Sequence, residues 1–286
     1  LMQLLEFFTR YLPGIAGITA LRYLSRTPRA YSGPVLLLIV TLSLAGFTAS
    51  MAKSLDTNLL ERNRYIAGGD VMLFDMGQDT GGSSAAAPGN VEAAMVATTS
   101  TEDAKLTGPK YFFLPITDYL SMPGVAHATR VANTKARIVI NSKTLDAHYY
   151  GIDRLEFPQV AYWRSDFADQ PLGELMNLLA EDPSAVLVDK AYAKMVNLRV
   201  GDSFFIQMNN LDSTVNVPVI VKGYINLFPT AYPSEGPVVV GNLEYSFDMQ
   251  GGQYPYDVWL RLTDQDTVSE DDIYRGTITL GMRTFM

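Results

Sequence analysis

One long uncharged stretch constrains this chain more than any other feature. Residues 30–52 (AYSGPVLLLIVTLSLAGFTASMA) contain no charged side chain, although Arg29 precedes them and Lys53 follows them. A helix of this length rises about 34 Å at about 1.5 Å per residue, against a hydrocarbon core of about 30 Å. Every backbone N–H and C=O inside lipid must be hydrogen-bonded within its own segment, and a helix achieves this. The stretch therefore predicts one membrane-spanning helix over 30–52.

The same stretch is compatible with two alternatives to a membrane helix. A helix buried inside a large soluble protein can also lack charge over such a length. A cleaved signal peptide would use residues 35–47 as its apolar region and Ser50-Met51-Ala52 as a small-x-small cleavage site. The run lies much further from the start of the chain than the apolar region of a usual signal peptide, and this favours a retained membrane helix.

The helical pattern does not stop where the apolar run stops. Residues at helical spacing continue beyond the supposed cleavage site, namely Leu55, Leu59, Arg62 and Ile66. Gly68-Gly69 then supplies a helix stop. We therefore expect the membrane helix to leave the bilayer and continue as a stalk as far as these glycines.

Positive and negative charges are separated along the chain, which has 286 residues and a net charge of −8. Residues 1–53 are net positive, with Arg10, Arg22, Arg26, Arg29 and Lys53 against Glu6 alone. Because cytoplasmic loops of membrane proteins are enriched in Lys and Arg, we expect 1–29 in the cytoplasm and 53–286 outside the cell membrane. The acidic outer part argues against a nucleic-acid partner, since phosphate binding needs basic patches.

The segment before the apolar run has an amphipathic pattern. On a helical wheel of residues 15–29, Arg22, Arg26 and Arg29 gather on one side, and small or apolar residues share the other. Such a segment can lie in the membrane interface with its arginines at the lipid headgroups. We take these three as candidate interfacial arginines and 1–29 as a cytoplasmic or interfacial segment. A short linker with positive-inside arginines is the alternative.

Small residues recur every four positions inside the predicted membrane helix. Thr41, Ala45 and Ala49 follow this spacing, with Gly46 and Ser50 beside them. Small-xxx-small spacing lets a second helix approach closely, and this is how transmembrane helices associate. The candidate helix-packing face is therefore Thr41, Ala45, Gly46 and Ala49, and it implies a partner inside the membrane.

Beyond the stalk the chain predicts a mixed, β-rich α+β domain over 53–286. Residues 70–75 alternate like a strand, and 76–110 are rich in Gly, Ser, Ala and Thr, which is typical of a flexible insertion. Further strands are expected at 137–140, 145–150, 186–188, 203–208, 215–226, 238–240 and 257–262, with helices at 170–181 and 190–197. Pro171 is expected at the first position of its helix. The absence of regular βαβ alternation favours the α+β class.

The sequence carries no pattern of a catalytic or cofactor site. It has no cysteine, no P-loop GxxxxGK[ST] and no nucleophile elbow GxSxG. Its two histidines, His127 and His148, stand apart and lack metal-ligand spacing. We therefore assign no catalytic, cofactor-binding or metal-binding residue and expect any ATP hydrolysis on another chain.

Several polar and aromatic residues have simple structural interpretations. Asp153 and Asp202 are placed to turn the chain, and 270–272 (EDD) is a solvated face or a helix start. The aromatic residues either line a hydrophobic binding surface or fill the core, and they are Trp163, Tyr224, Phe228, Tyr232, Tyr254 and Tyr256.

Four segments, taken in order, resemble a known family. They are ALRYLSRTPRAYSGPVLLLIVTLSLAG (20–46), YIAGGDVMLFD (65–75), DPSAVLVDKAYAKMVNLRVGDSFFI (182–206) and VPVIVKGYI (217–225). The first resembles the amphipathic entry ALRNLxRxPxR and first membrane helix of FtsX/MacB-like ABC transporter permeases. The others resemble the exit from the stalk, the segment with a GlxxGD turn, and the apolar strand of that family's extracytoplasmic domain.

The resemblance implies a function and partners. Permeases of this family pair with a separate cytoplasmic ATPase, form dimers, and transmit ATP-driven motion to an extracytoplasmic domain. That domain lies between the first membrane helix and three later ones, and no later apolar run precedes Met286. We therefore expect this chain to be a piece of a longer permease.

Two functions from different classes follow. The first is a permease subunit fragment of an ABC transporter, used for export or substrate extrusion together with the ATPase and a second permease copy or homologue. The alternative is a single-pass, membrane-anchored extracytoplasmic binding or sensor domain. The sequence does not identify the substrate.

Overall fold

The computed structural model describes residues 28–79, 111–140, 143–209, 214–264, 268–280 and 284–285. The chain divides into two compact units, Leu1–Arg62 and Asn63–Met286. The predictions for Arg22 and Arg26 and for most of the 76–110 insertion lie outside the described residues.

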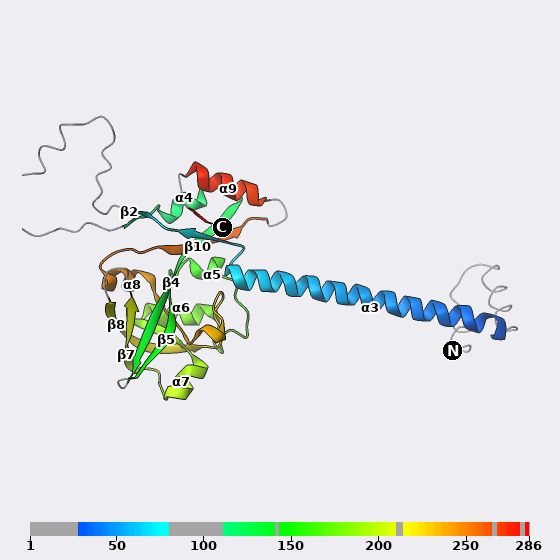
Figure 1. The fold of residues 1–286 in the computed structure, drawn as a ribbon, viewed down its shortest axis with the longest axis horizontal. Coiled ribbons are helices and arrows are strands. Elements are labelled where there is room, and N and C mark those ends of the chain that lie inside the picture. Colours follow the sequence, from blue (N-terminus) through cyan, green and yellow to red (C-terminus); the bar gives the residue numbers. More distant parts are fainter. Residues whose placement is uncertain are drawn as a thin grey trace, which may run out of the picture. The chain divides into compact units, whose positions relative to one another are not determined.

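Helix α3 runs without interruption from Pro28 to Ala67, a length of 40 residues. Figure 1 shows it as one continuous helix. Gly68 ends it with a left-handed backbone (φ 72°), a conformation that glycine adopts without steric cost. The predicted continuation of the apolar helix into a stalk that stops at the two glycines is confirmed. The last turn of α3, residues 63–67, belongs to the second unit.

The second unit is built around a mixed sheet of nine strands among the described residues. The strands are β1 (Val71–Asp75), β4 (Val125–Ile140), β5 (Lys143–Ile152), β6 (Ala185–Asp189), β7 (Ser203–Asn209), β8 (Thr214–Ile225), β9 (Val238–Asn242), β10 (Tyr256–Leu262) and β11 (Thr284–Phe285). Their order is β11-β1-β10-β4-β5-β9-β6-β8-β7. β5 and β9 are parallel, as are β6 and β8, and the remaining pairs are antiparallel. A separate ribbon pairs β2 (Gln78–Asp79) with β3 (Tyr111–Phe112).

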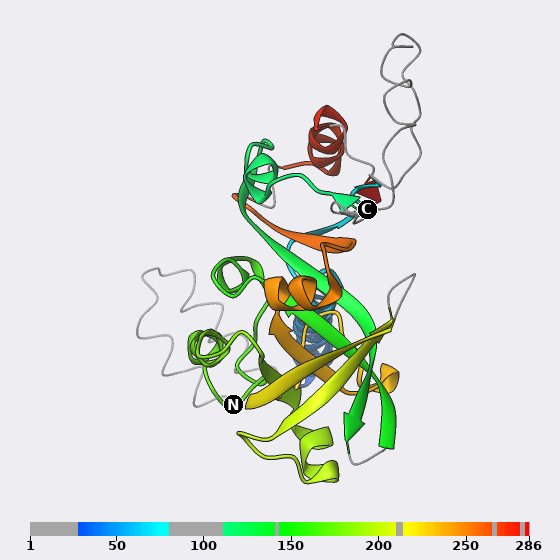
Figure 2. The ribbon, with the colours of Figure 1, turned by 90° about the vertical axis from the view of Figure 1, so that its left-hand side faces the viewer.

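Strand β4 closes part of this sheet into a barrel. Its second half pairs with β5 on one side and with β7 on the other, so β4, β5, β9, β6, β8 and β7 form a closed ring. Its first half pairs with β10 instead, in the part of the sheet that holds β1 and β11. Figure 2 shows β4 crossing from the part that holds β10 to the barrel. One strand therefore belongs to both parts of the domain.

Three apolar clusters fill the described part of the domain. The barrel interior is lined by one face of its strands, including Ile138, Tyr149, Ile206, Val219 and Val239. The opposite face of several of these strands is covered by α5 (Phe157–Val160) and α6 (Leu172–Ala180). A third cluster joins β1, β10 and β4 to α4 (Ile116–Leu120), α8 (Leu243–Gln250) and α9 (Glu270–Thr279). The domain is α+β, as the sequence predicts.

Local signals account for several boundaries. The short helix α7 (Lys190–Val196) begins at Asp189, whose carboxylate accepts from two backbone N–H groups, and ends at Asn197 in the left-handed conformation. Asp202 accepts from the backbone N–H of Arg199, which confirms its predicted role in the turn. Ser269 and Asp272 form a capping box at the start of α9, so the acidic run does mark a helix start.

Two predictions about elements were wrong. Pro171 is the N-cap of α6, not its first helical residue. The strand expected to begin at 137 begins at Val125, because its first half alternates small and polar residues that lack a clear strand pattern. Helix α8 was not predicted at all, since its apolar residues are sparse.

Candidate functional site

The apolar part of α3 has no covering within its own unit. Every side chain from 33 to 64 is exposed. The exposed large apolar side chains include Leu36, Leu37, Leu38, Leu42, Leu44 and Phe47. Burial of one such side chain stabilises by about 1.5–3 kcal/mol, so the whole set strongly favours an apolar surrounding over water. Among the described residues, α3 is the one helix with the length and composition to cross a membrane.

The candidate packing face lies along this exposed helix. Thr41, Ala45, Gly46 and Ala49 are all exposed, and a Cβ placed on Gly46 would meet no atom within 4 Å. The Thr41 hydroxyl donates to the carbonyl of Leu38 at 3.0 Å, so it is satisfied inside the helix, as lipid requires. The packing face stays a prediction. Arg29 lies in the first turn of α3, and its side chain is outside the described residues.

The last turn of α3 is held by the loop between β8 and β9. The Tyr65 hydroxyl donates to the carbonyl of Ala231 at 2.5 Å, and the Tyr65 carbonyl accepts from the backbone N–H of Thr230 at 2.8 Å. Thr230 has φ 67°, which is rare for a β-branched residue and marks a strained loop. The Tyr65 ring also contacts Phe167 and Tyr232 edge-on, at 5.8 and 5.9 Å between centroids.

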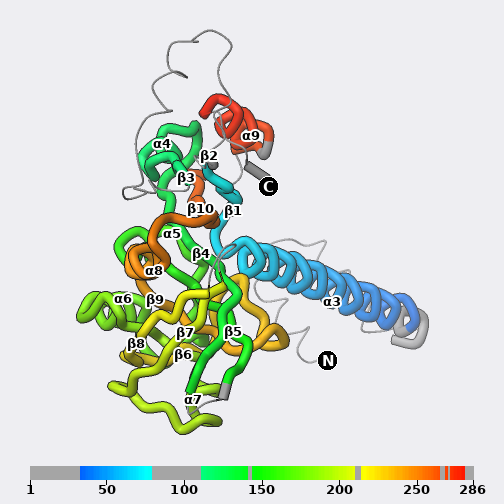
Figure 3. Tube along the Cα trace, turned by 60° about the vertical axis from the view of Figure 1, so that its left-hand side comes forward, coloured from blue at the N-terminus to red at the C-terminus, as the bar shows by residue number. Residues whose placement is uncertain are grey.

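The chain leaving α3 is fixed just as closely. A Cβ on Gly68 would lie 2.5 Å from the indole of Trp259, so only glycine fits there. The Gly68 carbonyl accepts from the N–H of Tyr162, and Asp70 bonds β10 through its N–H and its carboxylate. We call Tyr65, Gly68, Thr230, Ala231 and Trp259 the α3 junction. Figure 3 shows the end of α3 continuing into β1 beside β10.

The junction rests on a cluster of aromatic rings. Trp259 is fully buried, with ring centroids of Phe157 and Phe228 at 5.7 and 6.2 Å, and Tyr150 lies 4.7 Å from Phe228. Rings in tilted contact pack rigidly and add to the burial energy. Of the aromatic residues with two predicted roles, Phe228 and Tyr256 are core residues, and Tyr232 is 41% exposed.

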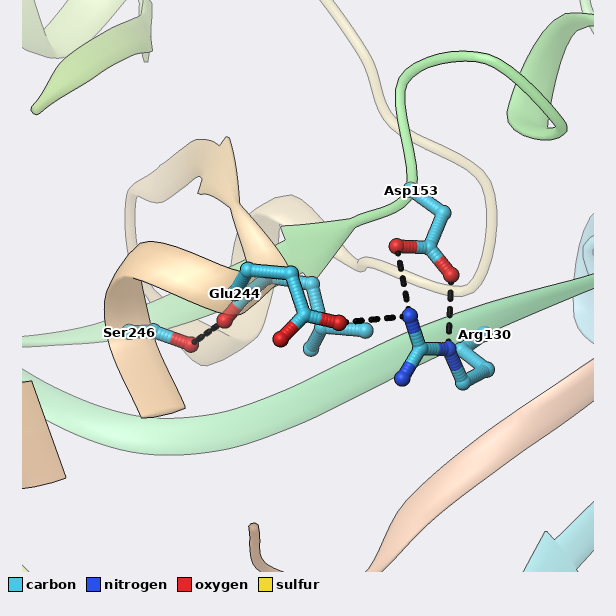
Figure 4. A network of polar contacts seen from close by, with 5 residues as sticks. Arg130, Asp153, Glu244 and Ser246 are labelled. Carbon is cyan, nitrogen blue, oxygen red and sulfur yellow. Dashed lines mark hydrogen bonds and ion pairs between the residues drawn. The ribbon is translucent and has the colours of Figure 1, made fainter. Parts of the chain in front are cut away.

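Arg130 joins three segments of the domain, as Figure 4 shows. From β4, its guanidinium donates to both oxygens of Asp153 at 2.7 and 3.1 Å and to Glu244 on α8 at 2.6 Å. Burial alone would lower the pKa of Arg130, but the two carboxylates together raise it. Asp153 directly follows β5, as its predicted turning role requires, but its side chain is an ion-pair partner. No sequence pattern marks Arg130 or Glu244 as members of this network.

A groove opens beside this network at the start of α8, with a volume of about 430 Å³. Its lining includes the buried residues Leu179 and Leu243 and the exposed Leu155. Among the described residues, no group of three or more His, Asp or Glu side chains is placed to hold a metal ion. His148 instead approaches Asn133 at 3.2 Å and stacks on Tyr150.

No protein-family model and no curated protein matches the chain. Among solved structures it is similar to the periplasmic region of MacB from Actinobacillus actinomycetemcomitans, with 14% identity, a TM-score of 0.41, and coverage of 78% of this chain and 87% of that one.

It is also similar to the extracellular domain of the noncanonic ABC-type transporter YknZ from Gram-positive bacteria, with 13% identity, a TM-score of 0.38, and coverage of 59% and 83%. A third similarity is to a domain described as part of a permease protein from Porphyromonas gingivalis, with 14% identity, a TM-score of 0.37, and coverage of 57% and 67%.

Replacing Gly68 by alanine should destabilise the junction. The added Cβ meets Trp259 in a backbone conformation that alanine disfavours, and we expect a loss of about 2–4 kcal/mol in the free energy of unfolding. Gly173→Ala is the matched control, because a Cβ there meets nothing and alanine favours a helix by about 0.5–1 kcal/mol. Urea unfolding of the full chain in detergent micelles measures both, and equal effects would contradict the packing described for Gly68.

Replacing Arg130 by methionine should leave a partly buried Asp153 without its cation. Removing one partner of such a pair costs about 3 kcal/mol. Arg137→Met is the control, because Arg137 pairs with Asp146 on the surface, where an ion pair contributes about 0–1 kcal/mol. If both variants unfold at the same urea concentration, Arg130 does not join the three segments energetically.

Proposed function

We propose that this chain is part of a permease subunit of an ABC transporter. In this proposal the predicted segment 30–52 of α3 spans the membrane, 1–29 lie in the cytoplasm with Arg22, Arg26 and Arg29 at the headgroups, and 53–286 form the extracytoplasmic domain. A separate cytoplasmic ATPase hydrolyses ATP, and the subunit couples this to movement of the domain for export or substrate extrusion. A second permease copy or homologue packs on the face of Thr41, Ala45, Gly46 and Ala49.

The continuity of α3 up to Tyr65 is the observation that carries this proposal. A membrane anchor that only tethers a domain can be joined to it by a flexible linker. Transmission of a movement from the membrane to the domain instead needs a stiff, continuous helix. In α3 each turn is hydrogen-bonded to the next, with no non-helical residue between the apolar part and the last turn. That turn is bonded to the β8–β9 loop through both the side chain and the backbone of Tyr65.

The order of the family-like segments supports the same proposal. The entry segment, the stalk exit, the GlxxGD turn and the following strand occur in the order expected for this family. At this turn Asn197 has a left-handed backbone, and the Asp202 carboxylate accepts from the backbone N–H of Arg199.

The chain lacks cysteine, so single cysteines can test its orientation. In intact cells, Ser203→Cys, on an exposed position of β7, should react with a membrane-impermeant maleimide. Ser25→Cys should react only after the cells are opened, because we place residue 25 in the cytoplasm. The reverse labelling would overturn the proposed orientation.

The packing face separates a permease from a single-pass anchored sensor. In a permease, Ala45→Leu with Ala49→Leu should abolish cross-linking to the second permease copy, because the added side chains prevent close approach of the helices. Val40→Leu changes a residue on the other side of α3 and should leave cross-linking intact. A double variant that assembles like the wild type would favour the single-pass sensor.

A further inference from the structure

The two most exposed large apolar side chains among the described residues of the second unit lie on different surfaces. They are Met195, near the end of α7, and Leu155, in the groove beside α8, with exposed fractions of 71% and 64%. Neither belongs to one of the three apolar clusters. A single exposed apolar side chain is common on a protein surface, so the charges around each one decide what could cover it.

Met195 lies in a basic surface patch. Lys194 precedes it on α7, Arg199 and Val200 follow in the connection to β7, and all four side chains are exposed. The ion pairs of the described residues include neither Lys194 nor Arg199. The one acid between 194 and 202 is Asp202, which accepts from the backbone N–H of Arg199. We call Lys194, Met195, Arg199 and Val200 the α7 patch, and its charge is positive even when Asp202 is counted.

The groove beside α8, which we call the α8 groove, carries the opposite charge. Four of its lining side chains are acidic, and they are Asp153, Glu156, Glu244 and Asp248. Arg154 is the one cation in the lining, and Arg130 binds Asp153 and Glu244. The ion pairs of the described residues include neither Glu156 nor Asp248. These two carboxylates are therefore left to attract a cation from another molecule.

Apolar side chains also line the α8 groove. Leu179 and Leu243 are buried, and Leu155 is exposed. The volume of about 430 Å³ falls in the range of sites that hold small organic groups, so an unbranched side chain such as that of methionine can enter. Methionine suits such a contact because its flexible side chain adapts to irregular apolar surfaces. The α7 patch and the α8 groove therefore match in apolar character and in charge.

We propose that the α7 patch of one copy of this chain docks in the α8 groove of a second copy. Met195 then contacts Leu155, and the two cations of the patch face Glu156 and Asp248. Figures 1 and 3 show α7 and α8 apart from each other on the domain, so one chain does not cover its own groove with its own patch. A two-fold dimer forms the contact twice, because each copy offers both surfaces.

Charge favours a second copy in this one orientation. The chain beyond residue 53 is acidic, so two copies repel each other over most of their surface. Contact of a basic patch with an acidic groove replaces that repulsion by attraction at one place. The inference rests on the proposed function and deepens it, because it gives two permease copies a contact outside the membrane as well as one between their helices. Two linked contacts hold a dimer more firmly than either contact alone.

Because the chain has no cysteine, one introduced cysteine in each copy can test the contact. Two differently tagged copies of the full chain, one with Met195→Cys and the other with Leu155→Cys, are expressed together in membranes and treated with a short bismaleimide. We expect a cross-linked product that carries both tags. Met195→Cys with Thr279→Cys, an exposed position of α9 outside the groove, is the matched control and should give no such product.

Three results of this experiment would overturn the proposal. They are the absence of the patch–groove product, equal cross-linking of the control pair, and a strong product of Met195→Cys with itself, which would place two patches against each other.

Charge reversal tests the complementarity directly. In the copy with the patch cysteine, Lys194→Glu with Arg199→Glu should slow cross-linking about tenfold, because acids then face acids. In the copy with the groove cysteine, Glu156→Lys with Asp248→Lys should slow it to a similar extent. When the two reversed copies are combined, the rate should return to that of the unreversed pair. Misfolded copies would not restore the contact, and a pair that stays slow would contradict the proposed match of charges.

Anionic lipid is another surface that a basic, apolar patch can meet. The Met195→Cys chain is therefore labelled with maleimide in phosphatidylcholine vesicles with and without phosphatidylserine. Equal labelling in both supports docking on a second copy. Protection that appears only with phosphatidylserine, together with the absence of the patch–groove product, would assign the patch to lipid and overturn the proposal.

Failure of this inference is distinguishable from failure of the proposed function. Loss of the patch–groove product in copies that still cross-link through α3 would overturn the docking alone. A patch–groove product in copies whose α3 helices do not cross-link would support the docking and count against the proposed membrane packing.

Discussion

The hydrogen bonds of Tyr65 are the interaction on which the architecture depends most. They join the last turn of α3 to a strained loop between two barrel strands, and this loop contributes Phe228 to the aromatic cluster of Trp259, Phe157 and Phe228. Gly68 directly follows α3 and packs against the indole of Trp259, so no flexible segment separates the helix from the sheet. The helix therefore ends against a core, and a displacement of Tyr65 or Gly68 must be shared with side chains that are packed and bonded.

Strand β4 connects the part of the sheet that contacts the end of α3 to the barrel. Its first half forms a ladder with β10, which carries Trp259, and its second half closes the barrel against β7. Arg130 lies on the first half and binds Asp153 and Glu244, so an ion-pair network ties the end of β5 and the start of α8 to the same strand. Under the proposed function, these connections allow the barrel and the second part of the sheet to respond as one body.

The sequence predicts those features that depend on interactions between residues close together in the chain. The uncharged run, the two glycines and the Asp-capped α7 each depend on neighbouring residues, and the hairpin of β7 and β8 follows from alternation on either side of a polar turn. Contacts between distant residues carry no such signal. Arg130 and Glu244 are 114 residues apart, and the pairing of β4 with β7 closes a barrel that no local pattern marks. Tyr65 looks like any stalk residue until its loop partner, 166 positions later, is known.

The closed barrel has a consequence for how this domain can vary. A ring of strands has no open edge, so its backbone hydrogen bonds do not rely on the segments that connect the strands at their ends. Connections between the strands can therefore change in length and composition at small cost to the scaffold. The loop from β8 to β9 is different, because it holds the helix. Natural diversification of this molecule should spare this loop and the segment around Tyr162, which also bonds the end of the helix, and be freest at the other connections.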